Sequence, residues 1–254
     1  MPIPPSTRTR LEKMANDNGF DLPVEDQGDW LLIHSSRVPL RMWLSVRGGS
    51  VYLAALSQLH VARALSEHGN ELTNPIPKGA CAVRTVSDLL SLHRLVRRAF
   101  QLSGTLPDEL LHTFLRKTES LPRQTEVERL VVQRIGQDVF RQGLLDFWEG
   151  RCAITGLAIP ELLRSSHIKP WADCETDAER LDIWNGFLLA PNLDSAFDRG
   201  FVTVRSDGSI EVSPSVSAED RARLGIDKPL RIAKLSDPHK PYLTWHWEKV
   251  FRGG

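Results

Sequence analysis

The sequence predicts an α+β fold, and three patterns along the chain support this prediction. Residues 41–46 and 50–55 are apolar runs separated by Gly48-Gly49, a spacing typical of a β-hairpin. Residues 86–102 repeat apolar side chains at the period of an amphipathic helix. After Gly150 the pattern changes to short apolar runs separated by turns. Strands and helices are therefore mixed along a chain that has no internal repeat.

The length of 254 residues favours two domains, because one domain usually takes about 100–200 residues. We expect an N-terminal α+β domain over residues 1–105 and a second domain over residues 106–254. Besides the hairpin and the helix above, the first domain is expected to contain a helix at 8–18, a strand at 29–34 and a helix at 57–68. These elements carry no metal cluster, phosphate loop or nucleophile motif.

A helical connector leads into the second domain. Thr125 and Glu128 form a capping-box pattern, which predicts a helix that runs to about Trp148 and is closed by Gly150. Gly136 within this helix indicates a bend or close packing. The side chains expected on the buried face of the helix are Val127, Leu130, Val131, Val139, Leu145 and Trp148.

The remainder of the second domain is predicted to consist of short elements. Residues 166–169 are extended and end at Pro170, and Thr176 and Glu179 form a second capping box. Further elements are an apolar run at 185–190, helices at 192–199, 217–224 and 241–251, and a hairpin at 201–212. The last helix is expected to present Tyr242, Trp245 and Val250 to a core.

The cysteine content and hydropathy indicate the cellular compartment. Three scattered cysteines are too few for a disulfide framework, which favours a reduced, intracellular protein. No apolar run is long enough to span a bilayer, and the N-terminal residues lack the pattern of a signal peptide. We therefore expect a cytoplasmic protein without a membrane partner.

A histidine at the end of an expected strand is followed by an asparagine and by two carboxylates on an expected helix: His167, Asn185, Asp194 and Asp198. Hydrolysis of a phosphodiester needs a base for the attacking water, charge neutralisation at phosphorus and a cation near the leaving oxygen. Histidine suits the first task because its pKa lies near neutrality. Mg²⁺ suits the others and prefers oxygen ligands.

Four motifs in this region resemble those of the HNH nucleases, in the bacterial branch that lacks Cys-x-x-Cys zinc knuckles. They are CAITG at 152–156, SHIKPW at 166–171, NG at 185–186 and LDSAFDRG at 193–200. The resemblance covers about residues 125–205, with a core motif at about 150–205. It implies a ββα-metal fold with flanking helices and metal-dependent cleavage of DNA, with Mg²⁺ or Mn²⁺ as cofactor and no structural zinc.

The resemblance also implies a role for each site residue. His167 matches the general base at the end of the first strand, and Asn185 matches the asparagine that braces the loop and orients the histidine. Asp194 matches the metal-binding position on the helix, and Asp198 is a second ligand or a support. Ser166 stands where the family often has a metal-binding Asp or His, so coordination is expected to rely on Asp194, Asp198 and water.

Several charged and aromatic residues allow two interpretations each. Arg164, Lys169 and Arg199 could contact DNA phosphates, although a surface charge or an ion pair is the alternative. An excess of acidic residues at 151–213, flanked by basic segments at 84–141 and 218–252, suits a metal site that meets DNA with help from its neighbours, with ordinary solvated surface charge as the alternative. In the first domain, three arginines on the expected helix could contact phosphates or could form its solvent-exposed face: Arg94, Arg97 and Arg98. Three aromatic residues in the expected strands could line a pocket for a flipped base or could be core residues: Trp30, Trp43 and Tyr52.

The leading hypothesis is a bacterial, Mg²⁺- or Mn²⁺-dependent HNH endonuclease, of restriction type against foreign or modified DNA. Its N-terminal domain would recognise the target or sense an effector. One alternative is a non-catalytic DNA-binding or regulatory protein that retains the ββα scaffold. Another is a nuclease that an effector switches on. A homodimer is one possible arrangement, because a single ββα site cuts one strand.

Overall fold

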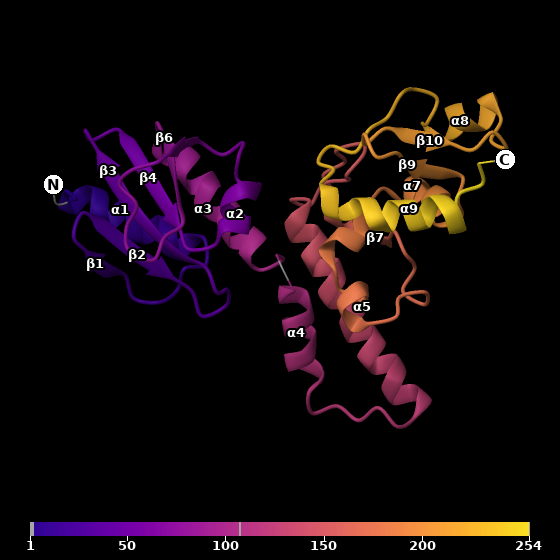
Figure 1. Cartoon of the computed structure of the whole chain (residues 1–254), viewed down its shortest axis with the longest axis horizontal. Helices are drawn as coiled ribbons and strands as arrows, with labels where there is room; N and C mark the ends of the chain where they lie inside the picture. The colour runs from indigo at the N-terminus through magenta and orange to yellow at the C-terminus, as the bar shows by residue number, and fades with distance from the viewer. Residues whose placement is uncertain (1–2, 107, 254) are drawn as a thin grey trace. The chain divides into compact units, whose positions relative to one another are not determined.

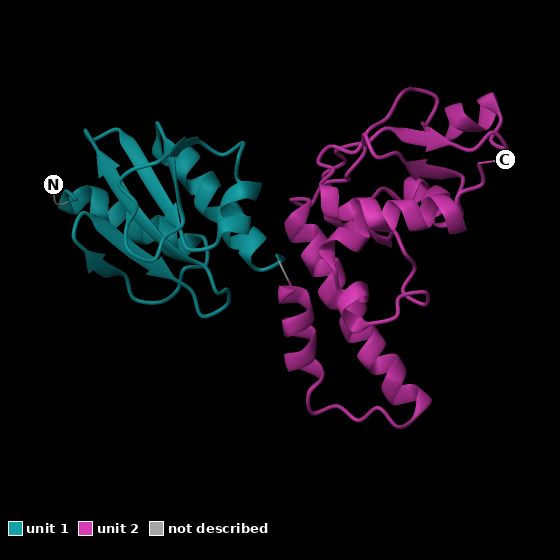
Figure 2. Cartoon of the chain, viewed as in Figure 1, with its two compact units in different colours: residues 1–106 teal, residues 107–254 magenta. Residues whose placement is uncertain are grey.

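The computed structural model describes residues 3–106 and 108–253. The first two of the N-terminal residues that were expected to lack a signal-peptide pattern lie outside the described residues. The chain forms two compact units, residues 1–106 and 107–254, which Figure 2 shows in separate colours. Each unit combines helices and strands, which confirms the α+β class.

The N-terminal unit is built on a six-stranded antiparallel sheet in the order β1-β2-β3-β4-β6-β5 (Figure 1). Its strands are β1 (Glu25–Gln27), β2 (Trp30–His34), β3 (Arg41–Arg47), β4 (Val51–Leu56), β5 (Asn70–Leu72) and β6 (Ala82–Val86). Its helices are α1 (Pro5–Asp17), α2 (Leu59–Ala64) and α3 (Leu89–Ser103). The hairpin predicted at Gly48-Gly49 joins β3 to β4, and both glycines have a positive φ.

All three helices of this unit differ from the sequence prediction in their bounds, and the helix expected at 8–18 already begins at Pro5. The predicted helix at 86–102 begins only at Leu89, because Val86 pairs with Tyr52 in the sheet and Asp88 caps the helix by accepting from Ser91 N. The predicted helix at 57–68 is helical only over Leu59–Ala64. The short strands β1, β5 and β6 have no clear signal in the sequence, because tertiary pairing rather than periodicity makes them strands.

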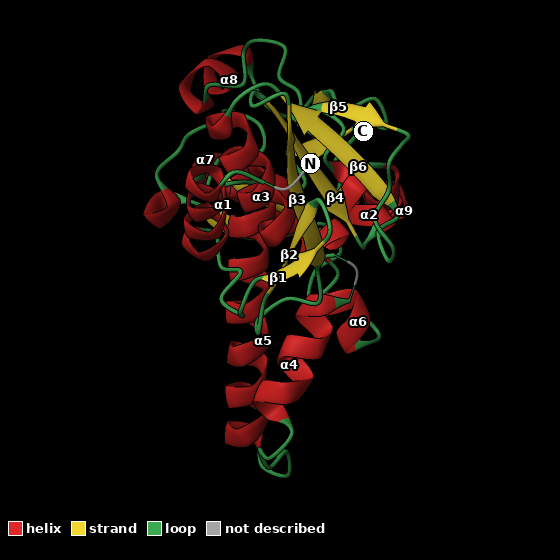
Figure 3. Ribbon diagram, turned by 90° about the vertical axis from the view of Figure 1, so that its left-hand side faces the viewer, coloured by secondary structure: helices red, strands yellow, loops and turns green. Residues whose placement is uncertain are grey.

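The sheet buries both faces. On one face, helix α3 contacts β4 and β6, and α1 packs against α3 (Figure 3). On the other face, Trp30 and Trp43 belong to a core cluster with Leu32, Leu53, Ala55 and Val83. Trp43 is 1% exposed and Trp30 is 8% exposed, so both tryptophans are core residues; Trp30 also lines a cavity of about 270 Å³ that Trp43 does not line. On α3, Arg94 and Arg97 are exposed whereas Arg98 is buried, so the three arginines do not form one surface patch.

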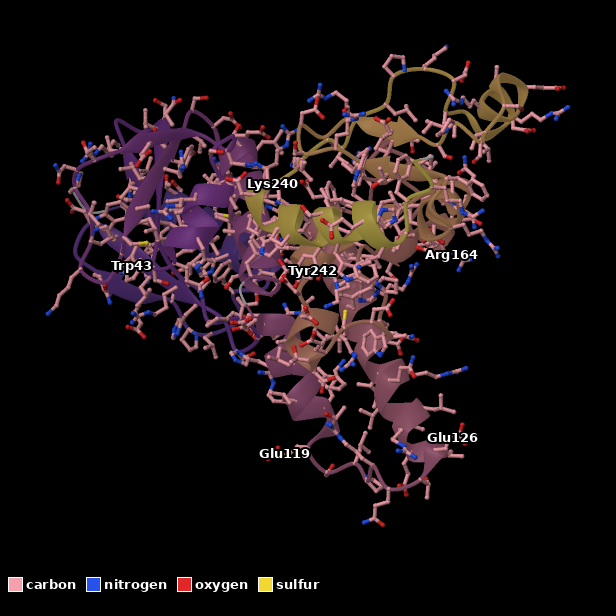
Figure 4. All side chains as sticks on the ribbon, turned by 45° about the vertical axis from the view of Figure 1, so that its right-hand side comes forward. Trp43, Glu119, Glu126, Arg164, Lys240 and Tyr242 are labelled. Carbon is pink, nitrogen blue, oxygen red and sulfur yellow. The ribbon has the colours of Figure 1, made fainter. Side chains whose placement is uncertain are left out.

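The C-terminal unit begins with a helical hairpin of α4 (Glu109–Thr118) and α5 (Glu126–Phe147). Glu119 and Glu126 mark the end of the hairpin where the chain turns from one helix into the other (Figure 4). The predicted capping box of Thr125 and Glu128 is present, with both reciprocal hydrogen bonds. Helix α5 ends one residue before Trp148, as its sequence pattern predicts to within a residue.

The predicted buried face of α5 is partly wrong. Val139 and Trp148 are buried, but Val127, Leu130 and Val131 are 70%, 53% and 47% exposed. The buried side chains instead include Val132, Phe140, Leu144 and Phe147. The first half of α5 has α4 as its main neighbour, so only the side of the helix toward α4 is covered there.

Two short antiparallel strands and a helix follow. The strands β7 (Arg164–His167) and β8 (Gly186–Leu189) pair with His167 opposite Gly186, and α7 (Pro191–Asp198) packs against β7. The long β7–β8 connection contains α6 (Asp177–Arg180) and the 3₁₀ turn η2 (Ile183–Asn185), while η1 (Pro160–Leu162) precedes β7. This is the ββα arrangement.

The last segment packs around α7. It comprises β9 (Val202–Val204), β10 (Ile210–Val212), α8 (Ala218–Leu224), η3 (Asp237–His239) and α9 (Lys240–Lys249). Helix α9 buries Leu243 and His246, while the expected core residues Tyr242, Trp245 and Val250 are only partly buried. The His246 ring stacks on Phe197 of α7 at a centroid distance of 4.0 Å, which joins the C-terminal helix to the ββα frame. No described helix is long and apolar enough to cross a membrane.

Candidate functional site

His167 lies at the end of β7, with its ring held on three sides. It stacks on Phe140 of α5 at a centroid distance of 3.8 Å and meets the edge of Trp171 at 5.6 Å. Its Nε2 is 2.9 Å from the carbonyl oxygen of Arg180. Burial lowers the pKa of His167 to about 4, although the contact with that carbonyl opposes the shift. The ring is therefore neutral at neutral pH.

The contact with Arg180 determines the tautomer of the ring. A carbonyl oxygen can only accept, so Nε2 must carry the hydrogen and Nδ1 must carry the lone pair. Nδ1 has no hydrogen-bond partner among the residues that the structure describes. The side chain lines a cavity of about 320 Å³ that Ser166, Asp198 and Val250 also line. The neutral ring thus lines a small cavity with both polar and apolar walls.

Two glycines make room for this arrangement. A Cβ at Gly186 would lie 2.4 Å from Phe140 Cζ, and a Cβ at Gly136 would lie 2.5 Å from Trp171 Cη2. The close packing that Gly136 predicted is therefore present, because α5 approaches the ring of Trp171 there. Phe140 and Trp171 together clamp His167, and the sequence offered no signal for the role of Phe140.

Asn185 is fully buried and ties the two ends of the β7–β8 connection together. Its Oδ1 accepts from the backbone N–H of Lys169 at 2.8 Å, and its Nδ2 donates to the carbonyl oxygens of Lys169 and Glu179, both at 3.1 Å. The Nδ2 group also lies 3.3 Å from Cys174 Sγ. Because Glu179 precedes Arg180, this amide fixes the segment whose carbonyl holds His167.

An ion pair reinforces the same loop. Lys169 Nζ lies 2.9 Å and 3.2 Å from the two carboxylate oxygens of Glu179, and this contact raises the pKa of Lys169 and lowers that of Glu179. The Lys169 side chain is 12% exposed. Lys169 was predicted to contact a phosphate, and in this structure its charge is already engaged by Glu179. The capping-box pattern at Thr176 and Glu179 was the only sequence signal for Glu179.

Asp194 and Asp198 project from successive turns of α7 toward the Ser166 hydroxyl. Ser166 Oγ donates to Asp198 Oδ1 at 3.1 Å and also interacts with the Asp194 side chain. Loss of water raises the pKa of both carboxyls, and the neighbouring charge of Asp194 raises that of Asp198 further. The structure thus brings Ser166, Asp194 and Asp198 together, and Ser166 and Asp198 line the same cavity as His167.

The two carboxylates fit a hard divalent cation. Within residues 3–106 and 108–253, no group of three or more His, Cys, Asp or Glu side chains is placed to hold a metal ion. Mg²⁺, however, is commonly held by one or two carboxylates, and water and substrate phosphates complete its shell. Two mutually repelling carboxyls that share the Ser166 hydroxyl, with Asp198 and Ser166 lining the cavity, suit that mode of binding.

Arg164 and Arg199 flank the acidic pair. Arg164 begins β7 and its charge opposes the rise in the pKa of Asp194, while Arg199 follows α7 and acts on Asp198 in the same way. Both side chains belong to exposed residues. Neither forms an ion pair within 4 Å of a carboxylate in the described part of the chain.

The cysteines of this unit have local roles. Cys152 Sγ accepts from the backbone N–H of Ala190 at 3.3 Å, just before α7 begins. Cys174 contacts Asn185 as described above. Both thiols are buried and unbridged.

The ββα frame with a histidine at the strand end and carboxylates on the helix is matched by one family model. Residues 152–205 match the HNH endonucleases. This chain carries an HNH endonuclease domain. The match covers β7, β8, α7 and β9, and it confirms the resemblance inferred from the four motifs. No curated protein matches the chain.

The HNH endonuclease domain supports a nuclease as the general class of the protein. Nucleases of this family generally use divalent metal ions and act on DNA. The N-terminal unit, the α4–α5 hairpin and the segment after residue 205 lie outside the matched region.

Proposed function

We propose that this protein is a Mg²⁺- or Mn²⁺-dependent DNA endonuclease with His167 as its general base. The observation that carries the proposal is the hydrogen bond from His167 Nε2 to the Arg180 carbonyl, in a histidine that lines the same cavity as Asp198. This bond leaves the Nδ1 lone pair for a proton on the attacking water. The neutral ring accepts that proton, and the oxygen of the water attacks phosphorus while the bond to the leaving 3′ oxygen breaks.

The remaining residues act by positioning and binding. Asn185 and the Lys169–Glu179 pair hold the loop that orients His167. Asp194 and Asp198, with the Ser166 hydroxyl, would hold the cation, which supplies charge neutralisation at the phosphoryl group and the leaving oxygen. Arg164 and Arg199 are exposed cations beside the acidic pair, and we assign them to phosphate contacts.

The biological setting extends this proposal. A restriction-type role against foreign or modified DNA, in the bacterial cytoplasm, is supported by the small size of the ββα site, which leaves target choice to another part of the chain. We assign that choice to the N-terminal unit. A homodimer would cut both strands, because one ββα site cuts one.

Cleavage of supercoiled plasmid, modified and unmodified, with Mg²⁺ or Mn²⁺ tests the proposal. We expect nicking or linearisation that chelator abolishes and that His167→Ala removes. His112→Ala is the matched control, because His112 is an exposed histidine on α4, and its activity should equal that of the native protein. Cleavage that survives His167→Ala unchanged would show that the catalytic base lies elsewhere.

A non-catalytic DNA-binding protein is the second candidate, and the presence of Ser166 at a position of a family ligand favours it. It predicts DNA binding without cleavage and without Mn²⁺ binding that depends on Asp194. An effector-gated nuclease would bind Mn²⁺ through Asp194 yet cut only after a ligand is added. Metal titration and plasmid cleavage together therefore distinguish the active nuclease, the non-catalytic DNA-binding protein and the effector-gated nuclease.

A further inference from the structure

The segment that follows α9 runs along the end of α7. The backbone N–H of Arg252 donates to the carbonyl oxygen of Gly200 at 2.9 Å. A Cβ at Gly200 would lie 2.0 Å from the Val250 carbonyl oxygen, and the φ of Gly200 is +73°. This close approach therefore requires glycine at position 200, two residues after Asp198.

A second hydrogen bond holds the backbone carbonyl of Arg252. The Ser213 hydroxyl donates to the Arg252 carbonyl oxygen at 2.5 Å, and Ser213 is fully buried. The backbone N–H of Ser213 in turn donates to Phe201 O at 2.8 Å. Both backbone groups of Arg252 are thus tied to the strand region that directly follows α7.

The side chain of Arg252 remains exposed above this anchored backbone. Its guanidinium carbon lies 4.5 Å from the centroid of the Phe201 ring. The part of the chain that the structure describes offers it no carboxylate within 4 Å, in contrast to Arg205, which pairs with Glu211. Arg252 is therefore an unpaired cation whose position is largely set before any ligand arrives.

The backbone of Arg252 belongs to the segment that borders the His167 cavity, although Arg252 itself does not line that cavity. Val250, two residues earlier, lines the cavity together with Ser166, His167 and Asp198, whereas Arg252 does not. An exposed guanidinium on the segment that borders the cavity is suited to a phosphate near the one being cleaved. Arginine recognises phosphate through paired N–H donors, and a preorganised side chain loses less entropy when it binds.

We propose that Arg252 binds a backbone phosphate of the DNA strand adjacent to the scissile phosphate. This rests on the proposed function, since it names a substrate contact of the same site. It adds to the matched HNH region a residue from the C-terminal segment, which Gly200 and Ser213 bring to the site. The alternative is that the contact with Phe201 only stabilises the fold.

The test is binding of a fluorescent DNA duplex in EDTA, followed by anisotropy over a range of salt concentrations. A lost phosphate contact makes the slope of log K against log salt less steep by about 0.9. We expect that change for Arg252→Gln, with most of the slope kept in Arg252→Lys. Arg223→Gln is the control, because Arg223 is exposed on α8, lies in the same unit and carries the same charge.

The outcomes separate this inference from the proposed function. If the native protein binds and cuts DNA while Arg252→Gln keeps the native slope, the inference is overturned and the nuclease assignment stands. A lowered melting temperature with an unchanged slope would assign Arg252 to the fold alone. Failure of the native protein to bind DNA would overturn both. If Arg223→Gln changes the slope as much as Arg252→Gln does, the change reflects the net charge of the protein alone. That result would also overturn the proposed phosphate contact of Arg252.

Discussion

The Nε2 atom of His167, the last residue of β7, lies 2.9 Å from the backbone carbonyl oxygen of Arg180, which belongs to the β7–β8 connection. The orientation of the proposed base therefore depends on the conformation of the β7–β8 connection. The buried Asn185 amide and the Lys169–Glu179 ion pair both hold that connection in place.

The Lys169–Glu179 pair is expected to position His167 rather than bind DNA. Because small displacements of a catalytic group are costly, Glu179→Gln and Lys169→Met should each lower kcat on the order of 10- to 100-fold while KM changes little. The exchanged pair Lys169→Glu with Glu179→Lys should recover part of the activity. A Lys169→Met variant that instead raises KM with native kcat would show that Lys169 contacts the substrate.

Loss of the Asn185 amide should destabilise the C-terminal unit. Asn185→Ala leaves the buried N–H of Lys169 and the carbonyls of Lys169 and Glu179 without this partner, at a cost of about 3 kcal/mol in the free energy of unfolding. Asn192→Ala removes a single hydrogen bond, to the Leu224 carbonyl, at an exposed position. Urea denaturation should therefore show a loss below about 1 kcal/mol for that control. Equal losses in both variants would contradict the bracing role of Asn185.

Removal of one acidic side chain should weaken metal binding without harming the metal-free protein. Asp194 raises the pKa of Asp198, so Asp198→Asn relieves a repulsion and should leave the melting temperature without metal unchanged or higher. The native protein should gain about 2.7 kcal/mol of stability when Mn²⁺ is present at a hundred times its Kd. Asp194→Asn and Asp198→Asn should lose most of that gain, whereas Asp173→Asn, an exposed residue of the β7–β8 connection, should keep it. A full Mn²⁺ effect in Asp194→Asn would place the metal site elsewhere.

Acid should destabilise the C-terminal unit through its buried histidines. Burial lowers the pKa of His239 and of His246 to about 4, from an ordinary value of 6.5. The unfolded chain then binds more protons than the fold below pH 6.5, so the stabilising contribution of each ring is complete above 6.5 and is lost as the pH falls toward 4. The loss amounts to about 3 kcal/mol for each ring.

Comparison with a variant isolates this effect from the carboxyl groups, whose raised pKa values act in the opposite direction. The difference in unfolding free energy between the native protein and His246→Gln should shrink from pH 7 to pH 4, because only the native protein loses the contribution of that ring. Chemical denaturation at several pH values measures it. A difference that is constant over this range would show that His246 is not desolvated in the fold.

Interactions between residues close together in the sequence determined several helices, a hairpin and the order of the site motifs. The capping box at Thr125, the cap that Thr176 provides to Glu179 N, the Gly48-Gly49 turn and the order of the four nuclease motifs depend on neighbouring residues. The sequence alone therefore predicts the starts of α5 and α6, the hairpin and the HNH class. The motif spacing likewise places His167 at a strand end and Asp194 on a helix, because strand and helix geometry carry that information.

The tertiary structure decided what depends on residues distant in the sequence. Val127, Leu130 and Val131 have helical apolar spacing but remain exposed, because the neighbours that would cover that face are absent from the described structure around it. The engagement of Lys169 by Glu179, the stacking of Phe140 on His167 and the anchoring of Arg252 by Gly200 and Ser213 join separate segments. No local propensity encodes such contacts, since they exist only when packing brings the segments together.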